Sequence, residues 1–305
     1  MDKVSYPFAV GRIRVLEGKL IDAARWTRLR EASREEAVRL LSEIGYGAGA
    51  SKNDPESMIR AEEGETRKIL AELSPEPVWT DLFLLPTDAH NLKAVYKGKR
   101  LGQDVSRLLV EGGTVPAELM RISVEAGEYS MLPEAFRKVL EQKEEYPTLL
   151  EFSAAVDRAV FEQIRLVLHK KKNPLLSRYF AAQADFANVL STLRAAALKW
   201  DAEKLSKVLL TGGTISLDTF GQALISGQFV PELCRGDFSS AIRRALESYQ
   251  QDGRLTDVEE QFTEEQIALL SEGQVDTFSI GPVVCYWMRR DDEARKLRVL
   301  FAKKT

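Results

Sequence analysis

The sequence predicts an all-α fold built from three similar helical domains, and two observations support this prediction. Apolar residues recur at steps of three and four over long stretches, which is typical of amphipathic helices. The chain also repeats itself at an interval of about 100 residues, which indicates one supersecondary unit built about three times. The alternation of a β-strand is limited to a few residues, with 274–280 as its best candidate.

Each copy of the repeat begins with a proline and carries an acid eleven residues later. These pairs are Pro77 and Asp88, Pro174 and Asp185, and Pro282 and Glu293. The first two copies also share an asparagine one turn after the acid, Asn91 and Asn188. A polar pair that occurs more than once argues against a single catalytic centre. We expect Asp88, Asn91, Asp185, Asn188 and Glu293 to form structural joints, each anchoring a long helix to its neighbouring unit.

Further along the chain, the offset between matching segments of the repeat increases slightly. Gly112-Gly113-Thr114 recurs as Gly212-Gly213-Thr214, 100 positions later, and 136–141 recurs as 242–247, 106 positions later. An insertion within a packed helix would rotate its apolar face out of the core, whereas loops tolerate insertions at little entropic cost. The matched blocks are therefore helices, and the drift marks loops. We expect helical repeats over 1–76 and 77–173, and a third over 174–305 that ends in a long helix.

Within these repeats the longest helices are expected at 77–101, 174–200 and 282–302. Pro174 suits a first helical turn, where its missing N–H costs nothing. Pro86 lies inside the first long helix, where we expect a kink or a break, with Thr87 or Asp88 as a new N-cap. Shorter helices are expected at 36–44, 130–142 and 239–249, and the segments 58–73 and 152–169 lead into the long ones.

Composition limits the classes of partner. The chain has 305 residues, 44% of them apolar, and a net charge of −3, so it has no excess of positive charge to bind nucleic acid. Cys234 and Cys285 are expected to be free buried thiols, and the histidines, His90 and His169, form no cluster with metal-ligand spacing. Without a signal peptide or an apolar run of about 18 residues, we expect an intracellular protein that does not span a membrane.

Several motifs suggest chemistry but have a structural interpretation. The segment 45–49, Gly-Tyr-Gly-Ala-Gly, follows a helical pattern where a dinucleotide fold needs a strand, so it is interpreted as a helix C-cap and loop. The Gly-Gly-Thr elements lack the lysine of a phosphate loop and predict turns with positive φ. His90 has no acid or thiol placed as a relay partner, which favours a surface or interface histidine. The basic run 169–172 predicts a helix C-terminus, with contact to lipid headgroups as the alternative.

Four segments together resemble the C subunit of the V-type and A-type rotary ATPases, which is called the d subunit in the eukaryotic vacuolar enzyme. They are Tyr6–Glu17 (YPFAVGRIRVLE), Asp88–Ala94 (DAHNLKA), Leu109–Thr114 (LVEGGT) and Glu293–Leu300 (EARKLRVL). The resemblance covers essentially the whole chain, through the order and spacing of the motifs. The chain departs from the family at Gly11 and Lys296, where asparagine is usual, so the joint is expected to be altered in the first and last units.

The resemblance implies a pseudo-threefold funnel of helical domains and a non-catalytic role in the central stalk. Such a subunit is seated on the membrane proteolipid ring, holds the rotor shaft subunits (D and F type) in its mouth, and couples ATP synthesis or hydrolysis to proton or sodium transport. It needs no cofactor or metal and lies on the cytoplasmic side of the membrane, held through the complex. We expect the loops Gly112–Thr114 and Gly212–Thr214 to lie on one docking face.

Two alternatives from other classes stay open at this point. One is a free-standing helical repeat scaffold that binds a peptide or a partner helix. The other is an all-α lyase or transferase that uses Asp291 and Asp292 with a divalent metal, although Arg295 stands where the aspartate-rich motif needs a further acid. Stabilisation by magnesium would distinguish that enzyme from the other two classes.

Overall fold

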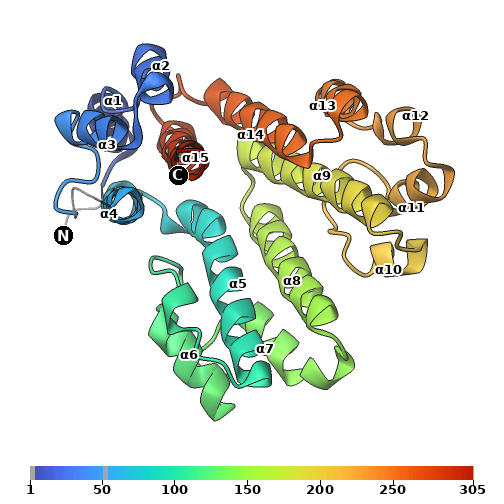
Figure 1. Cartoon of the computed structure of the whole chain (residues 1–305). Coiled ribbons are helices and arrows are strands. Elements are labelled where there is room, and N and C mark those ends of the chain that lie inside the picture. Colours follow the sequence, from blue (N-terminus) through green and yellow to red (C-terminus); the bar gives the residue numbers. More distant parts are fainter. Residues whose placement is uncertain (1–3, 51–53, 305) are drawn as a thin grey trace. The chain divides into compact units, whose positions relative to one another are not determined.

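The computed structural model describes residues 4–50 and 54–304, and all regular structure in these two ranges is helical (Figure 1). The described part contains fifteen α-helices and two short 3-10 helices. The segment 274–280 forms turns and bends rather than a strand. The predicted all-α class is confirmed. The chain divides into two compact units, Met1–Thr80 together with Leu270–Thr305, and Asp81–Leu269.

The first unit joins the two ends of the chain. Its helices are α1 (Tyr6–Glu17), α2 (Ala23–Glu31), α3 (Arg34–Glu43), α4 (Pro55–Leu73) and α15 (Gly281–Ala302). The C-terminal helix α15 packs against α1 and α4. Its Ala294, Leu297 and Phe301 share one apolar core with Leu29 and Leu41 from α2 and α3. The helix that the sequence assigns to the third repeat therefore lies among the helices of the first 80 residues.

Nearly all of two successive modules of similar design lies in the second unit, and each has a long helix, a loop, short helices and a returning helix; only the first four residues of α5 and the last three of α14 fall outside it. The first module comprises α5 (Pro77–Leu101), η1 (Ser106–Leu108), α6 (Ala117–Ala126), α7 (Glu134–Glu141), η2 (Lys143–Glu145) and α8 (Leu149–Lys170). The second comprises α9 (Pro174–Ala197), α10 (Ala202–Ser206), α11 (Leu217–Ser226), α12 (Phe229–Leu233), α13 (Ser239–Asp252) and α14 (Leu255–Glu272). The repeat boundaries at 76/77 and 173/174 stay a prediction.

Each module contains a stacked pair of aromatic rings. In the first, the ring of Tyr96 on α5 stacks on Phe152 of α8, with ring centroids 3.5 Å apart. In the second, the ring of Phe186 on α9 stacks on Phe262 of α14, with centroids 4.2 Å apart and ring planes 3° from parallel. Both pairs join the long helix to the returning helix. Burial of such rings contributes about 1.5 to 3 kcal/mol for each side chain.

Local sequence signals set where the long helices begin. Asn173 caps α9 by accepting a hydrogen bond from the N–H of Leu176, and Pro174 occupies the first turn, as predicted. Thr148 and Glu151 form a capping box at the start of α8, each side chain accepting from the backbone of the other. Helix α8 ends in the predicted basic run, with His169 and Lys170 in its last turn, where cations complement the helix dipole.

Of the kink or break predicted at Pro86, the break is wrong, because α5 is continuous from Pro77 to Leu101 with the proline inside it, and the kink stays a prediction. Pro86 is exposed, whereas Leu85 before it and Ala89 after it are buried. Packing on both sides of the proline holds the helix together although one backbone hydrogen bond is missing. Asp88 does not cap a new helix, since its carboxylate is used elsewhere.

Replacing the exposed proline should therefore stabilise the protein. For Pro86→Ala we expect the free energy of unfolding to rise by about 1 to 3 kcal/mol, because alanine restores the N–H donor and removes the ring clash. Urea unfolding of the purified chain measures this change. The reciprocal variant Gln183→Pro, at the matching position of α9, should lower the stability by about 3 kcal/mol or more. An unchanged or lower stability of Pro86→Ala would contradict the interpretation.

Candidate functional site: the repeated carboxylate joint

In the first module, Asp88 fixes the loop that follows η1. One carboxylate oxygen, Oδ2, accepts hydrogen bonds from the N–H and the hydroxyl of Thr114, and Oδ1 accepts from the N–H of Val115 at 3.1 Å. One turn further along α5, Asn91 makes two 2.8 Å hydrogen bonds to the backbone N–H and C=O of Val110. Both side chains are fully buried. Residues three apart share a helix face, so α5 holds both ends of the loop from 110 to 115.

The second module reproduces this arrangement almost bond for bond. Asp185 accepts from the N–H and the hydroxyl of Thr214 at 2.9 and 2.7 Å, and from the N–H of Ile215 at 3.1 Å. Asn188 bonds the backbone N–H and C=O of Leu210, both at 2.8 Å. The structure corrects one detail of the sequence interpretation. Each joint ties the long helix to the loop of its own module instead of to a neighbouring unit, because the donors lie in the loop that directly follows that helix.

The two glycines of each loop have different physical roles. Gly112 and Gly212 have φ of 88° and 100°, a region that residues with a side chain rarely adopt, so the predicted positive-φ turns are confirmed. A Cβ atom on Gly113 or Gly213 would collide with Oδ1 of the aspartate. The first glycine therefore permits the turn, and the second lets the backbone reach the buried carboxylate. Whether these loops also form a docking face stays a prediction.

A third joint connects the two ends of the chain within the first unit. Glu293 on α15 accepts a hydrogen bond from the N–H of Ile21, which is 272 positions away in sequence, and a second from Arg290 at 2.6 Å. Ile21 follows Glu17-Gly18 at the spacing with which Val115 follows Glu111-Gly112, a signal in the sequence that could have revealed the pairing. Here Lys19 replaces the second glycine, and a longer glutamate replaces the aspartate. The asparagine position is Lys296, which pairs with Asp292 at 2.9 Å.

Buried charges surround the third joint. The Arg290 guanidinium, 5% exposed, forms ion pairs with Glu293 and Glu62, and lies 5.5 Å from the centre of the Tyr46 ring. Burial raises the pKa of Glu293, and the nearby Arg290 opposes that rise. Burial and the Glu293 charge also raise the pKa of Tyr46. Removing one partner of such a network would leave an uncompensated buried charge.

The other residues singled out in the sequence have structural partners. His90 lies on the exposed side of α5 and bonds the backbone oxygen of Leu108 at 2.9 Å. Asp292 pairs with Arg295 at 2.6 Å, so it belongs to a charged helix face. Cys285 is a buried free thiol, as expected, whereas Cys234 is only partly buried. Among residues 4–50 and 54–304, no group of three His, Cys, Asp or Glu side chains is arranged to hold a metal ion.

The glycine-rich segment 45–49 follows a helix. Helix α3 ends at Glu43, and Gly45 and Gly47 have φ of 74° and 65°. The N–H of Gly45 bonds back to the oxygen of Ser42 at 3.0 Å. This is the geometry of a helix C-terminal turn, as the sequence predicted.

The fold and the joints together define a class of structural protein, in which buried carboxylates and amides hold loops of repeated helical modules in fixed positions. Comparison with known proteins identifies the family. Residues 9–304 match the family described as ATP synthase (C/AC39) subunit, so the chain belongs to that family. It is therefore an accessory component of the complex and not itself the catalyst, as the resemblance implied.

Curated relatives are similar in sequence to most of this chain. The C subunit of the A-type ATP synthase of Thermococcus onnurineus is 27% identical over 97% of this chain and 85% of its own length. The C subunit of the V-type ATP synthase of Thermus thermophilus is 24% identical over 97% of this chain and 93% of its own. The C subunit of the V-type sodium ATPase of Enterococcus hirae is 23% identical over 82% of this chain and 78% of its own.

The joints should contribute measurably to stability. We expect Asp185→Ala to lower the free energy of unfolding by about 2 to 4 kcal/mol, because it leaves two buried N–H groups and a hydroxyl without an acceptor. The melting temperature should fall by roughly 4 to 16 °C, as followed by circular dichroism. Asp218→Ala removes an exposed aspartate from the start of α11 and should change the stability by less than about 1 kcal/mol. A melting curve of Asp185→Ala that matches the wild type would contradict a stabilising role of the joint.

The joints also predict a pH dependence. Burial raises the pKa of Asp88 and Asp185 above the ordinary value of 3.8, and the hydrogen bonds from the loop oppose that rise. The folded chain therefore binds these protons at a higher pH than the unfolded chain does. The stability that protonation contributes is complete below 3.8 and is lost as the pH rises through the raised pKa values.

We therefore expect the stability difference between the wild type and the double variant Asp88→Asn, Asp185→Asn to shrink as the pH rises through this window. Urea unfolding at a series of pH values measures it. A difference that stays constant or grows with pH would contradict the assignment of the raised pKa values to these two carboxyls.

Proposed function

We propose that this protein is the central-stalk subunit of an A/V-type rotary ATP synthase or ATPase, and that it couples the rotor shaft to the membrane proteolipid ring. Family membership over residues 9–304 is the observation that supports this most strongly. Relatives named as C subunits of A-type and V-type ATP synthases, and of a sodium ATPase, support the same assignment. The ion that the complex moves is a proton or sodium.

The carboxylate joints fit a part that transmits torque. A coupling piece must resist deformation while two different partners act on it. In each module of the second unit, Asp88 or Asp185 holds one end of the loop with three hydrogen bonds, and Asn91 or Asn188 holds the other end with two. Fully satisfied buried polar networks of this kind stiffen a structure and specify a single arrangement.

We further propose that the loops Gly112–Thr114 and Gly212–Thr214 form part of a docking face. The buried aspartates fix the inner side of each loop, while Glu111, Gly112, Thr211 and Gly212 are exposed on the outer side. A loop held on one side and accessible on the other keeps its shape when a partner binds, which reduces the entropic cost of docking. Two such loops in equivalent modules would present matching surfaces.

No helix in the part of the chain that the structure describes is long and apolar enough to cross a membrane. We propose that the protein is held at the cytoplasmic face of the membrane through the rest of the complex.

A mild-detergent purification of the tagged chain from its native membranes tests the function. We expect the catalytic subunits, the shaft proteins and the proteolipid to co-purify in stoichiometric amounts, as identified by mass spectrometry. Recovery of the chain alone in the soluble fraction would overturn the proposal and favour a free-standing helical scaffold.

The docking face needs variants that leave the joints intact. Replacing Gly113 or Gly213 would disturb the joint itself. The test therefore places positive charge at two exposed positions of the same loops, in the double variant Glu111→Lys, Thr211→Lys. We expect the recovery of shaft or ring proteins per tagged chain to fall by about tenfold, since burying an unpaired lysine in an interface costs about 1.4 kcal/mol or more. Glu260→Lys on α14 is the matched control and should retain them. Full recovery with the double variant would remove these loops from the interface.

A further inference from the structure

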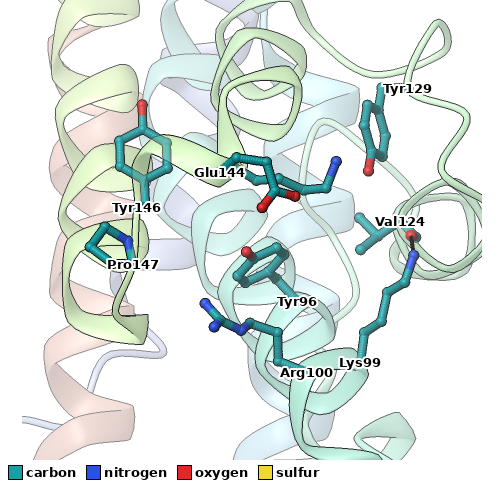
Figure 2. A pocket seen from close by; sticks show the side chains of 9 residues that line it. Tyr96, Lys99, Arg100, Val124, Tyr129, Glu144, Tyr146 and Pro147 are labelled. Atoms are coloured by element: carbon teal, nitrogen blue, oxygen red, sulfur yellow. Dashed lines mark hydrogen bonds between the residues drawn. The ribbon is translucent and has the colours of Figure 1, made fainter.

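The first module contains a cavity of about 380 Å³ whose walls are aromatic and whose rim is cationic. Figure 2 shows three tyrosines around it, Tyr96 from α5, Tyr129 from the loop after α6, and Tyr146 from the turn before α8. Arg100 lies next to Tyr96 in the same view, and Lys143 also lines the cavity. Sites for small molecules commonly enclose about 300 to 1,000 Å³ and combine apolar walls with a few polar groups.

The aromatic walls are held in position. Tyr96 is 7% exposed, and one face of its ring stacks on Phe152, so its orientation is fixed. Tyr146 meets the same Phe152 ring edge to face, with centroids 6.3 Å apart. Two of the three tyrosines are thus positioned by one buried side chain. Because these rings are already fixed, little conformational entropy is lost when a ligand binds against them.

The cations at the rim are available to a ligand. Within the described residues, Arg100 and Lys143 form no ion pair with a carboxylate, and the Lys143 ammonium lies 5.9 Å from the centre of the Tyr129 ring. Lys99, by contrast, already donates to the backbone oxygens of Val124 and Glu125 at the end of α6. The chain has 46 acidic and 43 basic residues, so carboxylates for pairing are abundant elsewhere. Glu144 is the one acid lining the cavity, which leaves its charge balance positive.

The internal repeat shows that the two rim cations are not needed for packing. At the offset that relates Asp88 to Asp185, Tyr96 corresponds to Leu193 and Arg100 to Ala197. At the offset that relates the blocks 136–141 and 242–247, Lys143 corresponds to Tyr249. The second module makes the same joint and a similar aromatic stack without these polar groups. The polar groups of the cavity are therefore an addition to a scaffold that folds without them.

We propose that this cavity binds a small planar aromatic ring that carries a phosphate group, as in a mononucleotide. Tyr129 and Tyr146 are half-buried and offer ring surfaces on which a base can stack. The Arg100 guanidinium and the Lys143 ammonium pair with the phosphate. The Glu144 carboxylate accepts a hydrogen bond from an amino group on the ring, which favours bases that carry one, such as adenine, over uracil and thymine. This site is separate from the proposed coupling role and does not depend on it.

Isothermal titration of the full chain with AMP tests the proposal. We expect AMP to bind with a dissociation constant below about 1 mM, and adenosine and inorganic phosphate each to bind at least tenfold more weakly, because each lacks half of the recognised groups. Adenosine binding as tightly as AMP would show that the cations take no part and would overturn the proposal. An absence of heat from AMP at millimolar concentrations, confirmed by saturation-transfer NMR, would overturn it as well.

The internal repeat suggests a variant that should weaken binding without harming the fold. Arg100→Ala with Lys143→Tyr introduces the residues of the second module, and should weaken AMP binding by tenfold or more while the melting curve is retained. Arg107→Ala removes an exposed cation outside the cavity and is the matched control. Should the double variant not fold, Arg100→Ala alone carries the test, since alanine suits the end of α5. Equal AMP affinity in the wild type and in Arg100→Ala would overturn the assignment.

Discussion

The rest of the structure depends on a buried carboxylate that accepts backbone N–H groups from a loop. Asp88 and Asp185 do this inside their own modules, and Glu293 does it between the two ends of the chain. A buried charge is tolerated only when its hydrogen-bonding capacity is used. The loop must therefore come to the helix in one register, which fixes where the short helices after it begin.

This constraint explains where the modules are alike and where they differ. The second glycine is required wherever an aspartate reaches the loop, because a Cβ atom would occupy the position of its oxygen. Where Lys19 stands instead, the acid is Glu293, whose longer side chain reaches Ile21. Away from the joint the modules vary freely. Pro86 is matched by Gln183, and the tyrosines and cations of one module are matched by other residues in the second, such as Leu193 and Ala197.

Family membership makes this chain an accessory subunit of a larger complex. Its ionisable groups are arranged for structure. Arg290 is buried between Glu62 and Glu293, and Asp292 and Glu293 take part in ion pairs and backbone contacts. The cavity beside Tyr96 is the exception, since in the part of the chain that the structure describes its Arg100 and Lys143 are not paired with a carboxylate, and Lys143 lies over the Tyr129 ring instead.

The sequence by itself determined the helical class, the repeat and the start of α9 at Pro174. It also determined that an asparagine follows each aspartate of the joints by one helical turn. These features depend on residues a few positions apart, where helical periodicity and capping act. Only the tertiary structure decided that Asp88 binds Thr114, that Glu293 binds Ile21, and that α5 continues through Pro86. Such contacts depend on which distant segments share a core, because packing can outweigh a local preference and sequence spacing does not specify the partner.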